Sequence, residues 1–250
     1  MFFWAAELDF SRNSSSNTYR FVDCAIISSE TRKIITLICV EWLMTNYRVV
    51  EHVTGKNGND KEYTVMAIEY HEPSYVKIRS NFLPKVGSNI EVNGTEAMQD
   101  GKKLGTVIEN RKAEDLRVNL HFDIKYTGGY SMDGKTIYLD ENFPKFFTVE
   151  GKSVSVSTVE SIGLHHELPE KWMSDNGYEY PYAHEIATGI EKMYVESLGV
   201  TWKGYCEEVD RNLRKVYSKT LQKSPPSLDL APYLYCRDRE ALKEIRQSEE

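Results

Sequence analysis

Cysteine is scarce in this 250-residue chain. The four cysteines, Cys24, Cys39, Cys206 and Cys236, form no CxxC pair, so their spacing indicates neither a thioredoxin-like motif nor a zinc ribbon. Two lie near the start of the chain and two near its end, which argues against a disulfide framework. We therefore expect four reduced and mostly buried thiols.

A long apolar run is also missing. The longest apolar stretch, residues 34–43, is interrupted by Glu41 and is far shorter than the roughly 20 residues that a membrane-spanning helix needs. The first residues, MFFWAAELD, lack the basic segment and the small-residue cleavage site of a secretory signal. We expect no membrane association and a reducing, cytoplasmic location.

Basic residues are outnumbered and form no block. The 31 Lys and Arg side chains against 38 Asp and Glu give a formal net charge of -7. Phosphate binding needs a basic face, so a nucleic-acid partner is not favoured. The apolar content of 40% and the aromatic content of 12% argue against disorder and allow a sizeable core.

Short strands between polar turns predict a small antiparallel β domain over residues 44–125. Polar and apolar residues alternate in part over residues 47–53, and GKNGND at 55–60 supplies the turn residues of a hairpin. Residues 1–43 differ in composition and form an N-terminal extension of uncertain status. Either Met44 is the natural start, or the preceding segment packs on the rest as a strand or a helix.

Helical periodicity begins near residue 158, after a short strand at 135–140 and a hairpin expected to turn at Gly151. Three helical segments follow, the last two over about 183–198 and 202–221. The sequence thus predicts an α+β fold, with the β domain followed by a helical domain (126–223) that a β-hairpin leads into. The Pro-containing tail, 224–250, is expected as an ordered strap or a mobile linker.

The segment LHHELPEKW carries the most informative side chains. His166, Glu167 and Glu170 form an H-E-x-x-E pattern, which differs from the zinc-protease motif H-E-x-x-H by one carboxylate. Positions i and i+4 of a helix share a face about 6 Å apart, so His166 and Glu170 can bind one ion. Glu167 then faces a metal-bound water and serves as the general base.

His184 completes the expected ligand set if the segment SDNGYEYPY turns the chain back as a helical hairpin. Three protein ligands and one open position are typical of catalytic zinc, which lowers the pKa of its bound water to about 7. We therefore expect a divalent metal, with zinc first. Glu191, seven residues after His184, is either a fourth ligand that closes the site or an acceptor that orients His184.

Pro169 decides whether the motif is helical, because proline is tolerated in a first helical turn and clashes in a helix interior. The helix begins either near His165 or at Pro169 itself, and the second case leaves the first two motif residues in a loop. A plain structural interpretation also exists, in which the cluster is a solvated face and His184 pairs with Glu191. A structural rather than catalytic metal is the remaining alternative.

Three tyrosines precede His184. Tyr178, Tyr180 and Tyr182 have phenol groups that can donate hydrogen bonds to an oxyanion near a metal. The alternative is that they pack across the helical hairpin or cap the second helix.

The last two fifths of the chain resemble a family of uncharacterised phage and prophage proteins. The shared features are a YxD strand, the HExxEK motif at 166–171, the AHxxAT segment at 183–188 with Glu191 after it, a GVxWxxY ending at Tyr205, and the PPSLDLAPY tail. The resemblance implies a metallopeptidase-like site at most, and the cytoplasm of the host cell as the location. Pro169 stands where the family pattern has an ordinary helix former.

The resulting hypothesis is a metal-dependent, peptidase-like hydrolase that acts on a protein or peptide. Its expected ligands are His166, Glu170, His184 and Glu191, and its catalytic base is Glu167. The alternative is a non-enzymatic phage accessory or assembly protein that binds a macromolecular partner, with the cluster purely structural. The sequence carries no signal for an oligomeric state.

Overall fold

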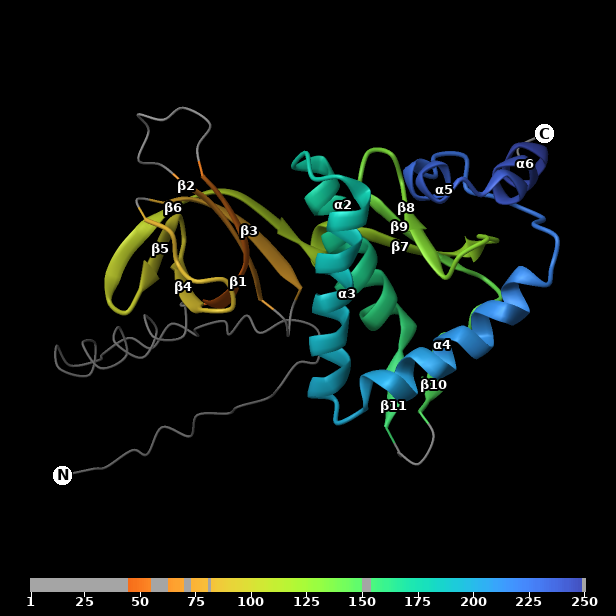
Figure 1. Ribbon diagram of the computed structural model, residues 1–250, viewed down its shortest axis with the longest axis horizontal. Helices are drawn as coiled ribbons and strands as arrows, with labels where there is room; N and C mark the ends of the chain where they lie inside the picture. Colours follow the sequence, from red (N-terminus) through yellow and green to blue (C-terminus); the bar gives the residue numbers. More distant parts are fainter. Residues whose placement is uncertain (1–44, 55–62, 70–72, 81, 150–153, 249–250) are drawn as a thin grey trace, which may run out of the picture. The chain divides into compact units, whose positions relative to one another are not determined.

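A computed structural model describes residues 45–54, 63–69, 73–80, 82–149 and 154–248 (Figure 1). A small antiparallel β domain comes first and the helices follow, which confirms the predicted α+β fold class. The expectations for residues 1–43, for Met44 as a start and for Cys24 and Cys39 lie outside the described residues. Among the described helices, none is long and apolar enough to cross a membrane.

The β domain is a closed barrel in the order β1-β2-β3-β6-β5-β4, with every neighbouring pair antiparallel. Its strands are β1 (Thr45–Thr54), β2 (Tyr63–Glu69), β3 (Ser74–Ser80), β4 (Asn89–Asn93), β5 (Glu96–Gln99) and β6 (Lys102–Lys112). Side chains of alternating residues fill the interior, among them Val49, Ile78 and Leu104. The predicted β1–β2 hairpin is confirmed by its pairing, while its turn at 55–60 lies outside the described residues.

A second, mixed sheet follows the barrel, in the order β7-β9-β8. Its strands are β7 (Arg117–Phe122), β8 (Gly128–Tyr130) and β9 (Thr136–Asp140). β7 falls within the range predicted for the β domain, yet it pairs with β9 in parallel and not with the barrel. Alternation reveals a strand but not its partner, so the sequence did not separate the two sheets.

The β-hairpin predicted before the helices is present as β10 (Phe146–Thr148) and β11 (Ser155–Ser157), which pair antiparallel. Its turn, including Gly151, lies outside the described residues. The helical elements that follow are η2 (Val159–Glu167), α2 (Leu168–Asp175), α3 (Tyr180–Ser197), α4 (Trp202–Tyr217), α5 (Ala231–Cys236) and α6 (Arg239–Ser248). Gly177 and Gly199, both at positive φ, lie in the turns that end α2 and α3.

Trp172 of α2 ties the helical region to β3 and β6. It is fully buried, its Nε1 donates to Glu109 Oε1 at 3.0 Å, and its ring lies 5.3 Å from that of Tyr75. Trp172 and Tyr75 belong to one apolar cluster that also includes Ile162 of η2. The helix carrying the H-E-x-x-E motif is thus anchored by apolar contacts from both its π-helical part, η2, and its α-helical part, α2.

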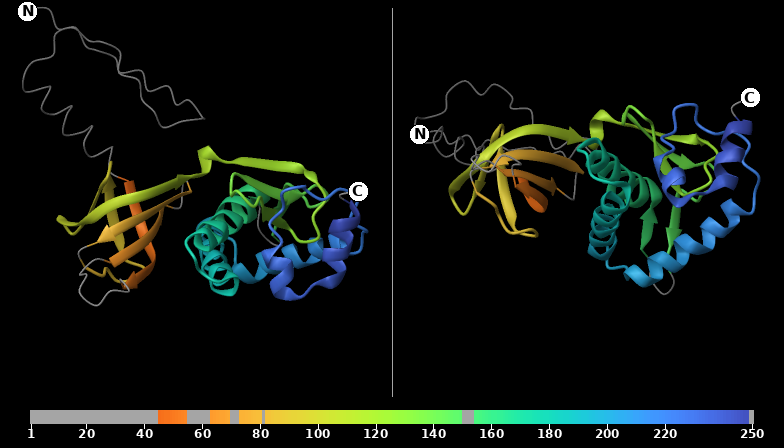
Figure 2. Two further views of the ribbon diagram at one scale, coloured as in Figure 1. Left: turned by 90° about the horizontal axis from the view of Figure 1, so that it is seen from above. Right: turned by 45° about the horizontal axis from the view of Figure 1, so that its top comes forward.

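The tail is an ordered strap, one of the two predicted alternatives. Its backbone follows the mixed sheet, since Met132 N donates to Ser227 O and Asp229 N donates to Tyr130 O, both at 2.8 Å. The strap leads into α5 and α6, which the sequence analysis did not predict (Figure 2). The tail is therefore a partly helical segment that packs on the domain, and not irregular chain throughout.

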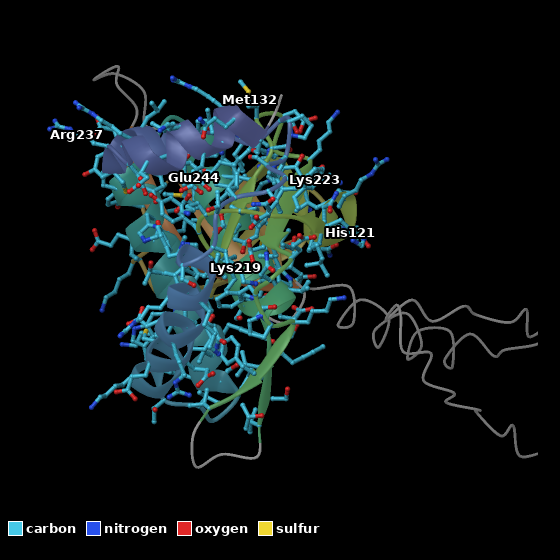
Figure 3. All side chains as sticks on the ribbon, turned by 90° about the vertical axis from the view of Figure 1, so that its right-hand side faces the viewer. His121, Met132, Lys219, Lys223, Arg237 and Glu244 are labelled. Atoms are coloured by element: carbon cyan, nitrogen blue, oxygen red, sulfur yellow. The ribbon has the colours of Figure 1, made fainter. Side chains whose placement is uncertain are left out.

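A buried ion pair fastens α6. Lys125 Nζ lies 2.9 Å from Glu244 Oε2, with side-chain exposures of only 8% and 17%. Lys125 Nζ also donates to the Lys219 carbonyl, and Glu244 accepts from Leu221 N (Figure 3 labels Glu244 and Lys219). One carboxylate therefore joins the connection between β7 and β8, the segment that follows α4 and the last helix.

Replacing Glu244 by alanine leaves the Lys125 ammonium buried without its carboxylate, so we expect the free energy of unfolding to fall by about 3 kcal/mol. Urea denaturation measures this. The matched control is Glu96→Ala, because Glu96 pairs with Lys103 where both side chains are more than half exposed, and it should cost less than about 1 kcal/mol. Equal losses in the two variants would contradict the role of the buried pair.

Asp140, at the end of β9, is a buried carboxyl next to Asp123. Burial raises the pKa of Asp140 most, the Ile124 backbone N–H partly lowers it, and Asp123 raises it further, to about 6. Because this folded-state pKa exceeds the ordinary value of 3.8, the carboxyl stabilises the fold below about pH 4. That contribution is lost as the pH rises through about 6.

The variant Asp140→Asn removes this titration. We expect the stability of the wild type relative to the variant to decline between pH 4 and pH 6 and to stay constant above that range. Thermal or urea unfolding at several pH values gives the profile. Wild-type and variant curves that run parallel from pH 4 to pH 7 would show that the pKa of Asp140 is not raised by folding.

Candidate metal centre

One continuous helix carries the H-E-x-x-E motif. The π-helical segment η2 runs directly into α2, and the Leu168 N–H bonds to the Gly163 carbonyl, five residues back. Pro169 is the second residue of α2 and lies inside this helix. The helix begins at Val159, as the periodicity from about residue 158 predicts, and the two starts considered for the motif itself, near His165 and at Pro169, are wrong.

The wider π-helical turn explains how proline is accommodated. In the i to i−5 pattern the acceptor for residue 169 is the Leu164 carbonyl, and proline has no N–H to offer it. The hydroxyl of Tyr75, from the barrel strand β3, donates to that carbonyl at 3.0 Å instead. A side chain far away in the sequence thus satisfies the acceptor that Pro169 leaves open.

Three ligand atoms converge at this helix. His166 Nε2 lies 3.2 Å from His184 Nδ1 and 3.6 Å from Glu170 Oε2, and the last two atoms are 2.7 Å apart. Two ligand atoms bound to one tetrahedral zinc ion are about 3.3 Å apart, given bond lengths of about 2.0–2.1 Å. The group His166, Glu170 and His184 can therefore hold a metal ion, once the hydrogen-bonded pair of His184 and Glu170 opens from 2.7 Å to the spacing of two ligands.

Glu191 contacts His166 and not His184. Its Oε2 lies 2.9 Å from His166 Nδ1, the ring nitrogen that points away from the other two ligands. The predicted stripe of His184 and Glu191 along α3 therefore does not bring these two side chains together. Carboxylates in this position orient a metal-binding imidazole and fix its tautomer. Glu191 has the position of such an acceptor, but it contacts His166 and not His184 as predicted.

Tyr205 of α4 extends this arrangement and was not singled out as a site residue by the sequence analysis. Its hydroxyl donates to Glu191 Oε1, and its ring is buried against Phe147 and Trp202. The available signal was the GVxWxxY ending of the family resemblance, which includes Tyr205. The chain Tyr205–Glu191–His166 links α4 and α3 to the ligand on η2.

The ionisation of the cluster follows from its carboxylates. Burial alone would lower the pKa of His166, but the charge of Glu191 and hydrogen bonds with Glu170 and Glu191 outweigh burial and raise that pKa well above its usual value. Burial would raise the pKa of Glu170, and its hydrogen bonds to His166 and His184 outweigh this and lower it. A metal ion must displace the proton that these carboxylates hold on His166.

Glu167 differs from the other carboxylates. It is only 7% exposed, and among the described residues its carboxylate has no hydrogen-bond or ion-pair partner. Burial, followed by the charge of Glu170, raises the pKa of Glu167 to about 8, although His166 partly opposes the shift. Its Oε1 lies against β8 so closely that a Cβ at Gly128 would approach it to 2.8 Å. The carboxyl of Glu167, which has no described partner, therefore lies one residue from the candidate ligand His166.

The surface-contact interpretation of the cluster is wrong. Glu167, Glu170 and Glu191 are all more than nine-tenths buried. His184 is the exception, with a side chain that is 47% exposed. The cluster is an interior site that reaches solvent on the side of His184.

Tyrosines from three elements surround the carboxylates. Tyr130 of β8, Tyr180 of α3 and Tyr233 of α5 have raised pKa values, caused first by burial and then by nearby Glu170 or Glu167. Of the three predicted tyrosines, Tyr180 is placed in this way, and the rings of Tyr178 and Tyr182 stack on each other with centroids 5.6 Å apart. The sequence did not predict Tyr130 or Tyr233 near the site, because Tyr130 lies on a three-residue strand and Tyr233 lies in the tail.

Neither of the two cysteines that the structure describes belongs to the group of candidate ligands. Cys206 and Cys236 are free thiols, as predicted, but Cys236 is exposed rather than buried. Comparisons of the chain with protein-family models, with curated proteins and with solved structures found no match.

Proposed function

We propose that the protein is a metal-dependent, peptidase-like hydrolase. His166, Glu170 and His184 hold a divalent ion, best suited to zinc, and Glu191 orients His166 as part of the same site. The observation that carries the proposal is the convergence of three ligand atoms beside the buried, unpartnered carboxyl of Glu167. The substrates we propose are proteins or peptides, and the family resemblance suggests a phage-encoded protein that acts in the host-cell cytoplasm.

The bound metal would supply a water of lowered pKa and polarise the substrate carbonyl. Glu167 takes the proton of the attacking water and later delivers it to the leaving amine. A general base works best with a pKa near the working pH. Burial and the charge of Glu170 raise the pKa of Glu167, and a cation held by His166 and Glu170 would lower it again, so that the ionised base forms when the metal is bound. We assign the hydrogen bond to the oxyanion to Tyr180, whose phenol is close enough to Glu170 and Glu167 for their charges to raise its pKa.

An open, catalytic metal is favoured over a closed, structural one. Three protein ligands leave a fourth position free, and Glu191 is engaged by His166 and Tyr205. The exposed edge of His184 gives that position a side facing solvent. The alternative is a non-enzymatic accessory or assembly protein. Its support is the group of exposed apolar side chains between β3 and β4, Phe82, Leu83 and Val86, which suit contact with a macromolecular partner.

Metal affinity tests the ligand set and its support. Protein purified without a histidine tag should bind about one equivalent of zinc, and His166→Ala should bind none. Glu191→Gln should weaken zinc binding by about 10- to 100-fold, because His166 loses its orienting carboxylate. Titration against a competing chelator measures the affinity. The matched control is Glu196→Gln, at an exposed position of the same helix, and equal affinities of the two variants would contradict the role of Glu191.

Hydrolysis tests the general base. Zinc-loaded wild type should cleave a mixture of unstructured peptides, as followed by mass spectrometry. Glu167→Gln should retain zinc and lose about 10²- to 10⁴-fold in kcat, because the amide cannot accept the proton. Glu185→Gln, beside His184 on the exposed face of α3, is the control and should cleave normally. The proposal fails if the zinc-loaded wild type cleaves no peptide or if Glu167→Gln cleaves as fast as the wild type.

A further inference from the structure

Helix α5 presents two large apolar side chains mostly to solvent. Pro232 and Tyr233 face the interior, whereas Leu234 is 60% exposed and Tyr235 is 57% exposed. These two neighbouring residues give α5 an exposed apolar surface.

This exposure is not a consequence of a loosely held tail. Asp229 N bonds to the Tyr130 carbonyl just before α5, and Tyr233 stacks on Tyr126 with ring centroids 4.5 Å apart. After the helix, Asp238 N bonds to the Tyr233 carbonyl. Contacts on both sides therefore fix the orientation in which Leu234 and Tyr235 face solvent.

A row of rings connects this surface to the metal centre. The ring of Tyr235 lies 5.3 Å from that of Tyr180, and the ring of Tyr180 lies 5.6 Å from that of His184. Helix α5 contacts α3, and both views of Figure 2 show it close to the helices that carry the ligands. The apolar surface of α5 is thus continuous with the exposed edge of the candidate ligand His184.

We infer that Tyr180, Leu234 and Tyr235 form a subsite for a large aromatic or aliphatic side chain of a peptide substrate, beside the bond to be cleaved. The inference rests on the proposed hydrolase function and adds its specificity. Aromatic faces and an exposed leucine bind apolar groups by removing them from water, and stacked rings add a preference for aromatic partners. Apolar peptides should therefore be oriented with their scissile carbonyl at the side of His184.

The test uses the zinc-loaded full chain and a set of quenched fluorescent peptides that differ at one position, occupied by Phe, Leu, Ala or Asp. The wild type should show kcat/KM about tenfold or more higher for Phe and Leu than for Ala. In Tyr235→Ala this ratio should fall toward one while zinc affinity is unchanged. Phe146→Ala removes an equally exposed aromatic ring from β10 and should keep the wild-type ratio.

The outcomes separate this inference from the function on which it rests. If the wild type cleaves all four peptides equally, or if Tyr235→Ala keeps the preference for Phe and Leu, the subsite is overturned and the hydrolase stands. If no peptide is cleaved by the zinc-loaded wild type, the hydrolase is overturned and the subsite with it. A circular dichroism spectrum of Tyr235→Ala that matches the wild type assigns a lost preference to the side chain and not to unfolding.

Discussion

The hydrogen bond from Tyr75 to the Leu164 carbonyl allows the motif helix to pass through Pro169. Proline removes a donor and crowds the preceding turn, and a π-helical turn relieves the crowding but leaves one carbonyl without a partner. Because the barrel supplies that partner, η2 and α2 remain one helix and His166 stays on the face of Glu170. The barrel therefore helps to shape a site to which it contributes no ligand.

Buried charge is the second constraint on this region. Carboxylates are costly to remove from water, and the cost is tolerable only where hydrogen bonds and opposite charges replace the lost hydration. Glu170 has two imidazoles, and Glu191 has His166 and Tyr205. Among the described residues Glu167 has no hydrogen-bond or ion-pair partner, the charge of His166 offsets its burial only in part, and the pKa of Glu167 is raised as a result. A fold that maximised stability alone would not keep such a residue, and functional sites are where such exceptions are found.

Local patterns made much of the fold predictable, and distant contacts limited the rest. Alternation located most barrel strands, but β5 has a single buried residue, Ala97, and so lacked a pattern. The spacing of His166, Glu170 and His184 anticipated their convergence. The contact of Glu191 with His166 depends on how α3 is rotated relative to η2. The role of Tyr75 depends on a contact between residues 89 positions apart in the sequence. No periodicity within a short window contains such information.

The strap also bears on the order in which the site is assembled during synthesis. The ligands on η2, α2 and α3 precede α5 in the chain, so they leave the ribosome while Tyr233 and Tyr235 are still unmade. At that stage Tyr233, whose phenol lies close enough to Glu167 for the carboxylate charge to raise its pKa, is not yet in place. Docking of the strap against Tyr130 then brings Tyr233 to Glu167 and completes the surroundings of the centre after its candidate ligands have been made.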